Sequence, residues 1–283
     1  MALRTAKNPP VAAHAAGPSS AAVSRRLRRA APALGYILPP LLALSLLALG
    51  WELWVRIADT PTYIMPAPTK IMDRLTGDLS FFAWHGWVTL YEAIAGCAIG
   101  SAVAIALAIA MAHSRALERS IFPLAVLVKV TPIVAVAPLF VIWFGFGSWP
   151  KMLIAALITF FPVMVNAMVG LRSVSPGALD FLRSVDASPR EIFWRLRWPA
   201  SFPFLFAALR IAAPLAVIGA VVGEWFTGDR GLGSVIIVAH NNLDMPTLFA
   251  AIVTLAVIGI SLMTIITVAE RRLLFWHESS LSQ

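Results

Sequence analysis

The sequence predicts an all-α integral membrane protein with six transmembrane helices. Its 283 residues are 59% hydrophobic and only 13% charged, a balance far from that of soluble domains. The apolar residues gather in segments of about 18 residues or more, the length that a helix needs to cross a bilayer. The single cysteine, Cys97, excludes a disulfide framework and a cysteine-based metal cluster.

Six apolar segments follow one another along the chain, and we expect each to cross the membrane once. They cover roughly residues 34–58, 89–112, 121–146, 151–171, 203–226 and 246–268. Residues 1–30 are rich in Ala, Pro, Ser and Arg and are expected to form a disordered basic tail. Residues 31–275 then form a single transmembrane domain, with a polar loop at residues 172–202, and residues 276–283 form a short tail.

Two of the segments carry small residues at every fourth position. This spacing lets two helices approach closely, so we expect each row to pack against a neighbouring helix. The alternative is that Ala and Gly are simply common in membrane spans. The rows are Gly96, Gly100, Ala104, Ala108 and Ala112 in the second segment, and Ala208, Ala212, Ala216 and Ala220 in the fifth.

Polar side chains within the apolar segments are candidates for function. Lys129 either reaches the near interface or lines a cavity, and we favour the interface. Asn166 and Glu224 are candidates for lining a solute pathway, with an interhelical hydrogen bond as the alternative for each. No acid–base pair stands out within a segment. The nucleotide-binding P-loop and the zinc- and serine-hydrolase motifs are absent, which argues against an enzyme.

A polar, arginine-rich stretch, residues 180–199 (DFLRSVDASPREIFWRLRWP), lies between the fourth and fifth segments. Ser188 suits a helix N-cap, Pro189 suits the first turn, and Glu191 completes a capping box. We expect a short helix that ends at Pro199, at a membrane face, and that binds a partner. The alternative is a solvated loop. Its apolar stripe is Ile192, Phe193 and Leu196, and its charged residues are Arg190, Arg195 and Arg197.

The distribution of basic residues predicts the orientation in the membrane. Six spans place both termini on one side, and fifteen Lys and Arg residues fall on that side together with the polar stretch. Four fall on the other side, namely Lys70, Arg74, Lys151 and Arg230. Because basic loops stay in the cytoplasm, we expect both termini and the polar stretch there. The positive net charge then reflects topology rather than nucleic-acid binding.

The polar stretch resembles the "EAA" loop of the permeases of binding-protein-dependent ABC importers. That pattern is E-A-A, three residues, Gly, nine residues and I-x-L-P. In this chain Asp180, Phe181 and Leu182 take the E-A-A places, and Asp186 takes the Gly place. Leu196, Trp198 and Pro199 take the Ile, Leu and Pro places. Asp in place of Gly is the main departure, although Asp tolerates a left-handed turn better than most residues.

Further stretches over about residues 35–275 are similar to the nitrate/sulfonate/taurine-type branch of that family. They are YIMPAPTKIMDRL (63–75), APLFVIWFGFG (137–147), WPASFPFLFAALRIA (198–212) and IGAVVGEWFTGDRGLG (218–233). Within the branch, VAPLFVIWFGFG followed by FFPVMVNAMVGLRSV resembles permeases for pyrimidine (thiamine-precursor) or riboflavin-like substrates.

The resemblance implies a type I importer bundle in the bacterial inner membrane, where two permease copies, most simply a homodimer, form the pathway. It implies a cytoplasmic ABC ATPase dimer that hydrolyses ATP, an extracytoplasmic binding protein that delivers the solute, and no cofactor on the permease itself. Residues 188–198 then form the helix that couples to the ATPase. A membrane scaffold that docks a cytoplasmic protein without moving solute is the alternative, and a membrane enzyme is a third.

Overall fold

The computed structural model describes residues 20–274, with side chains described from Leu38 onward. The chain divides into two units, residues 1–58 and 59–283. Within residues 20–274 the regular structure is helical, as the sequence predicts. Five helices are long and apolar enough to cross a membrane, or six when one sharply bent pair counts as a single span.

The first unit contains helix α1 (Ser20–Ile57). Its apolar part, Leu38–Ile57, is a candidate span. Residues 20–30, which we expected in a disordered tail, belong to the start of this helix, because alanine and arginine both favour helices. The remainder of the predicted N-terminal tail, residues 1–19, and the predicted C-terminal tail lie outside the described residues.

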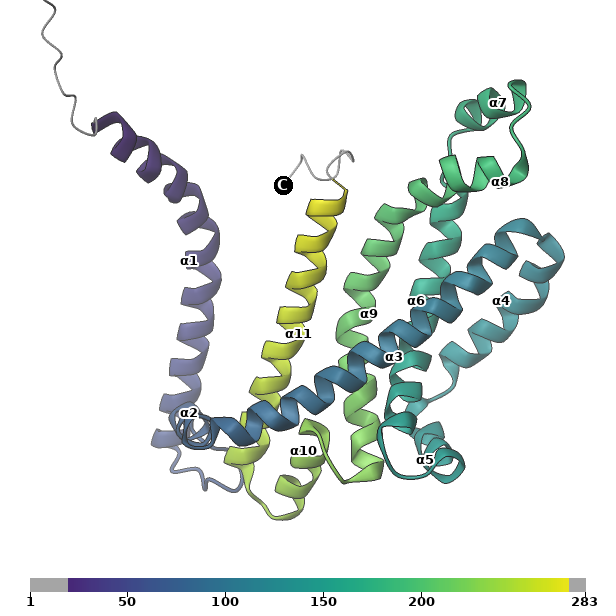
Figure 1. The fold of residues 1–283 in the computed structure, drawn as a ribbon. Helices are drawn as coiled ribbons and strands as arrows, with labels where there is room; N and C mark the ends of the chain where they lie inside the picture. Colours follow the sequence, from purple (N-terminus) through teal and green to yellow (C-terminus); the bar gives the residue numbers. More distant parts are fainter. Residues whose placement is uncertain (1–19, 275–283) are drawn as a thin grey trace, which may run out of the picture. The chain divides into compact units, whose positions relative to one another are not determined.

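The second unit is built on three long helices that pack side by side: α3 (Leu79–His113), α6 (Ser148–Arg172) and α9 (Trp198–Thr227) (Figure 1). Both rows of small residues lie in these contacts, as predicted. Ala104, Ala108, Ala208 and Ala212 are completely buried. A Cβ atom added at Gly100 would collide with the backbone of Ala156, so α3 and α6 touch almost backbone to backbone there.

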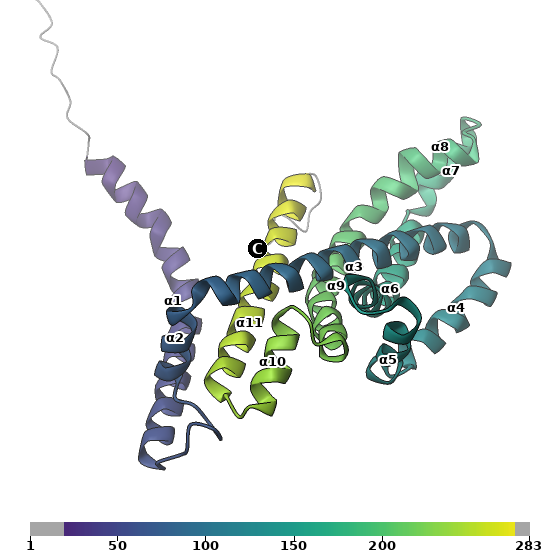
Figure 2. The same ribbon diagram turned by 60° about the horizontal axis from the view of Figure 1, so that its bottom comes forward.

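Shorter elements surround this bundle. Helix α2 (Pro68–Gly77) precedes α3, and α10 (Leu232–Asn241) lies between α9 and α11 (Met245–Leu273) (Figure 2). The polar stretch forms α7 (Pro176–Ser184), α8 (Pro189–Ile192) and one turn of π-helix, η1 (Phe193–Arg197). This stretch, the α3–α4 turn and the C-terminal end of α11 all lie at one end of the bundle (Figure 1).

The predicted third span is not one continuous helix. It consists of α4 (Arg115–Val130) and α5 (Ile133–Phe144), which meet at an angle of 98°. Pro132 stands at the break, where it removes a backbone N–H and disfavours helical geometry in Thr131, whose ψ is 125°. The predicted span at residues 121–146 is therefore a bent pair of helices, with the bend at one of the prolines of that segment.

Pro199 does not end the helix of the polar stretch, contrary to our expectation. The chain passes from α8 through η1 directly into α9, and Pro199 lies in the first turn of α9. The N–H of Trp198 donates to the carbonyl of Phe193, the five-residue step of a π-turn. Proline is tolerated in a first helical turn because its missing N–H is not needed there.

Candidate functional site

The loop between α6 and α9 is a helical hairpin that projects from the end of the bundle; we call residues 173–199 the coupling loop, after the motif that it resembles. Ser175 caps α7 by accepting a hydrogen bond from the N–H of Ala178 (3.3 Å). The hairpin turns at Asp186, whose φ of 55° lies in the left-handed region. The N–H of Ala187 closes the turn on the carbonyl of Leu182 (3.0 Å). Asp186 therefore adopts the conformation for which we expected it to replace glycine.

The predicted capping box of α8 is present. The N–H of Glu191 donates to Ser188 Oγ (3.3 Å), and the N–H of Ser188 donates to Glu191 Oε2 (3.0 Å). These two bonds satisfy backbone donors that the first turn of a helix otherwise leaves free. They fix the start of α8 and thus the direction of the turn that follows.

The expected face of α8 and η1 is only partly available to a partner. Arg190 and Arg195 are exposed, and Ile192 and Leu196 are half-buried. Phe193, which we expected as an apolar anchor for a partner, is instead buried in the protein's own core beside His113 and Trp198. The π-turn that begins at this residue changes the helical register, which a prediction based on 3.6 residues per turn does not anticipate.

Three large apolar side chains of the coupling loop are exposed instead: Phe181 (67%), Val185 (59%) and Trp194 (63%). Phe181 lies in the E-A-A part of the motif, but we predicted no role for the other two. Their signal was available, since apolar residues among charged ones in a loop outside the membrane are typical of a binding surface. Asp180, Asp186 and Ser188 are exposed beside them.

The two remaining loop candidates lie closer to the bundle. Arg197 and Pro199 are half-buried, and Arg197 lines a cavity between the coupling loop and the α3–α4 turn. The ion pairs on the loop, Arg183–Asp180 (3.6 Å) and Arg195–Glu191 (3.5 Å), are both largely exposed. Exposed pairs of this kind contribute little to stability, so these charges remain available to a partner.

Asn166 lies at a cavity between α6 and the α4–α5 pair. Its amide donates to the carbonyl of Pro162 (2.8 Å) on its own helix, and the cavity of about 560 Å³ opens beside the α4–α5 break. Lys129 lines the same cavity, with Nζ 4.7 Å from the centre of the Phe161 ring. We had favoured an interfacial position for Lys129, but the sharp bend after α4 places it at this cavity.

Glu224 is completely buried near the C-terminal end of α9. Thr89 Oγ1 donates to its Oε1 (2.7 Å), and the N–H of Gly233 donates to its Oε2. These bonds join α9 to α3 and α10, which is the interhelical role that we weighed against a pathway role. Gly231 makes room for the carboxylate, because a Cβ atom there would overlap it.

A buried ion network lies beside Glu224 and was not anticipated by the sequence analysis. Lys151 Nζ donates to Asp229 Oδ1 (2.7 Å) and lies 3.2 Å from Glu92 Oε1, and Ser148 Oγ donates to the same oxygen (2.9 Å). Lys151 and Glu92 are completely buried. We call Glu92, Lys151, Glu224 and Asp229 the ionic cluster. Glu92, a glutamate within an apolar segment, is the feature of the sequence from which this cluster could have been predicted.

The ionic cluster refines two expectations. Lys151, which we counted among the basic residues of the outer side, is a buried ion-pair partner, and its pair with Glu92 forms between two spans rather than within one. Asp229 lies in the turn between α9 and α10, outside the spans; burial acts to raise its pKa, but the hydrogen bond and charge of Lys151 outweigh that effect and lower the pKa. Among residues 38–274, no group of three or more His, Cys, Asp or Glu side chains is arranged to hold a metal ion.

Comparisons with known proteins agree with this architecture. Residues 100–275 match the family described as "Binding-protein-dependent transport system inner membrane component". The formylaminopyrimidine transport permease protein ThiX of Halalkalibacterium halodurans is 37% identical over 85% of this chain and 96% of that protein. The riboflavin transport system permease protein RibX of Chloroflexus aurantiacus is 38% identical over 88% of this chain and 92% of that protein.

A solved structure extends the likeness to the fold. A chain of the MetNI methionine ABC transporter in an inward-facing conformation superimposes with a TM-score of 0.56 and 15% identity, over 67% of this chain and 96% of that chain. The apolar helices and the sequence match over residues 100–275 indicate the same kind of protein. The chain belongs to the family of inner-membrane permease components of binding-protein-dependent ABC importers.

Proposed function

We propose that the coupling loop docks a cytoplasmic ABC ATPase and transmits its movement to the spans. The observation that carries this proposal is the exposure of Phe181, Val185 and Trp194 among charged residues at one end of the bundle. Binding energy at protein interfaces concentrates in such aromatic and arginine side chains. Because η1 continues into α9 without a break, a push on the loop acts directly on a spanning helix.

We also propose how the chain is oriented in the membrane and with which subunits it assembles. The coupling loop and the C-terminus face the cytoplasm, in keeping with the excess of basic residues on that side. Two copies of the chain, together with an ATPase dimer and an extracytoplasmic binding protein, form the importer. ATP-driven closure of the ATPases then shifts the bundle between inward-facing and outward-facing states.

We place the solute pathway at the cavity beside the α4–α5 break, with Asn166 as its principal polar residue. The cavity supplies an amide, the aromatic ring of Phe161 and the cation of Lys129, a combination that suits a small polar ring compound. The names of the relatives ThiX and RibX support a pyrimidine or flavin substrate. The aliphatic sulfonates of a more distant relative, 27% identical, are the second candidate class. Glu224 is the weaker pathway candidate, since its carboxylate is already hydrogen-bonded.

Co-purification tests the coupling loop. Tagged wild type and a Trp194→Ala/Arg195→Ala variant are purified from native membranes, and partners are identified by mass spectrometry. Both changed side chains are exposed, and the buried Phe193 is left intact. A Trp149→Ala/Arg230→Ala variant, which changes an exposed Trp and Arg outside the loop, is the matched control. We expect an ABC ATPase with the wild type and the control and its loss from the loop variant.

Equal recovery of the ATPase with all three proteins would show that the coupling loop is not the docking element. If no ATPase accompanies the wild type, the scaffold alternative gains support. Solute uptake into reconstituted vesicles then separates a transporter from a scaffold. Uptake by an Asn166→Ala variant, compared with Val169→Ala on the exposed side of the same helix, tests the pathway.

A further inference from the structure

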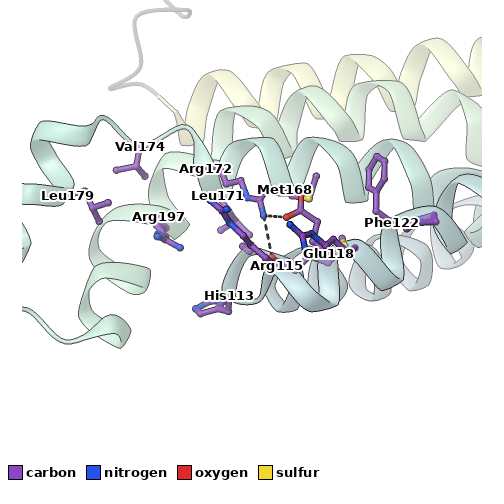
Figure 3. A pocket seen from close by; sticks show the side chains of 14 residues that line it. His113, Arg115, Glu118, Phe122, Met168, Leu171, Arg172, Val174, Leu179 and Arg197 are labelled. Atoms are coloured by element: carbon purple, nitrogen blue, oxygen red, sulfur yellow. Dashed lines mark hydrogen bonds and ion pairs between the residues drawn. The ribbon is translucent and has the colours of Figure 1, made fainter.

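A cavity of about 990 Å³ lies where three elements of the second unit end: the C-terminal end of α3, the first turns of α4 and the C-terminal end of α6. Arg197 of η1 closes it on the side of the coupling loop. Figure 3 shows these side chains around the hollow, with Arg172 and Glu118 joined across it. We call this cavity the arginine pocket.

Positive charge dominates the arginine pocket. Arg115, Arg119, Arg172 and Arg197 line it, against the single carboxylate of Glu118. Glu118 is engaged by Arg172 through a two-pronged ion pair, with Nη1 2.8 Å from Oε1 and Nη2 2.7 Å from Oε2. Within the described residues, the other three arginines form no ion pair. A concave surface with such an excess of one charge concentrates ions of the opposite sign.

The floor of the pocket is apolar. Phe122 and Pro123 follow Arg119 by about one turn of α4, roughly 5 Å along the helix axis, and Met168 faces them from α6. A free phosphate ion has no apolar part that could pack against this surface. A molecule that carries a phosphate on one end and a hydrocarbon chain on the other contacts both parts of the pocket.

The depth of the pocket in the membrane matches such a ligand. Two candidate spans, Leu79–His113 and Ser148–Arg172, end at its rim. The arginines therefore lie at the level of lipid headgroups, and Phe122 and Met168 lie at the level of the acyl chains. Basic pockets between spanning helices at the cytoplasmic face are known to take anionic headgroups.

We propose that the arginine pocket binds one anionic phospholipid, with its phosphate on Arg115, Arg119 and Arg197 and an acyl chain along Phe122, Pro123 and Met168. The site does not depend on the identity of the transported solute or on ATPase binding. Because Arg197 belongs to η1, the bound headgroup links α4 to the root of the coupling loop.

The test uses the purified transporter complex, stripped of lipid by detergent exchange and studied by native mass spectrometry. The probes are dioleoylphosphatidylglycerol, dioleoylphosphatidylcholine, glycerol 3-phosphate and inorganic phosphate. We expect one phosphatidylglycerol to bind per permease chain in preference to phosphatidylcholine. Glycerol 3-phosphate and inorganic phosphate, which lack acyl chains, are expected not to displace it.

An Arg115→Gln/Arg119→Gln variant is expected to bind phosphatidylglycerol about 30-fold more weakly, the loss expected for two cations near an anionic lipid. An Arg271→Gln/Arg272→Gln variant removes the same charge from exposed positions at the end of α11, outside both the pocket and the coupling loop, and is expected to bind like the wild type. Equal weakening in both variants would show non-specific attraction and overturn the proposal.

Two results on the wild type alone also overturn it, whether or not the variants fold. The first is equal binding of phosphatidylglycerol and phosphatidylcholine. The second is displacement of the lipid by millimolar inorganic phosphate, which would identify the pocket as a site for free anions.

Discussion

The two ends of the α3–α6–α9 bundle use charge in opposite ways. At the end where α9 meets α10, Lys151 is completely buried and held between Glu92 and Asp229. At the end that carries the coupling loop, three arginines face an open cavity without an acidic partner among the described residues. At the first end the charged side chains pair with one another. At the second end the arginines are available to bind other molecules.

The backbone shows the same contrast between the two ends of the bundle. Near the ionic cluster, Gly219 and Gly223 of α9 bring that helix against the backbone of α6, and the N–H groups that start α10 are hydrogen-bonded to α3 and α9. The coupling loop consists of short helices with exposed faces and exposed ion pairs. A transporter that moves as rigid parts needs such a contrast between a firmly joined region and a region completed by its partners.

Loss of Lys151 is expected to have the largest effect on stability. A Lys151→Met variant leaves Glu92 buried with a single hydrogen-bond donor, and removal of one partner from a buried ion pair costs about 3–5 kcal/mol. The melting temperature of purified protein measures this. The matched control is Arg56→Met, which removes the exposed partner (66%) of the Arg56–Glu52 pair (2.6 Å) at a cost of about 1 kcal/mol or less.

A second change sharpens that test. Adding Glu92→Gln to Lys151→Met removes the stranded charge and is expected to recover part of the lost stability. If Lys151→Met melts no earlier than Arg56→Met, the ionic cluster does not hold this end of the bundle together.

Gly100→Ala is expected to destabilise the α3–α6 contact by about 1–3 kcal/mol. The added methyl group would collide with the hydroxyl of Thr159 and with the carbonyl and Cα of Ala156, and the Ala156 backbone cannot move without shifting α6. Gly259→Ala in α11 is the control, since among the described residues no atom beyond its own stretch of helix lies within 4 Å of its Cβ position, and alanine favours a helix. Thermal unfolding of both variants measures the difference, and equal melting temperatures would contradict the close packing.

The sequence predicted features that depend on neighbours in the chain or on a regular period. The capping box of Ser188 and Glu191 is local, and the small-residue rows repeat every four positions. Features that depend on residues far apart in the chain could not be predicted from the sequence. Lys151 binds Asp229, which is far from it in the sequence. The π-turn that begins at Phe193 interrupts the 3.6-residue period from which we predicted that Phe193 is exposed.

Loss of the α8 cap tests the end of the bundle that carries the coupling loop. Ser188→Ala removes the bond that satisfies the N–H of Glu191 and is expected to cost the loop about 1 kcal/mol. Because α7 and α8 pack little against the bundle, we expect a small change in melting temperature and a larger fall in ATPase stimulation. Ser184→Ala, which removes a hydroxyl at the end of α7 without a cap, is the control. A fall in melting temperature as large as that of Lys151→Met would show that the loop is part of the rigid core.

Asp186→Gly is expected to have the smallest effect. At a φ of 55° glycine is free of the strain that a side chain imposes, but it also gains freedom in the unfolded state, so the two effects nearly cancel. Asp186→Val, which cannot adopt this conformation easily, is expected to cost about 1–2 kcal/mol in the loop. Proteolysis at the hairpin and ATPase stimulation measure both variants. If glycine weakens coupling as much as valine does, the carboxylate of Asp186 contacts the partner, and its role is more than conformational.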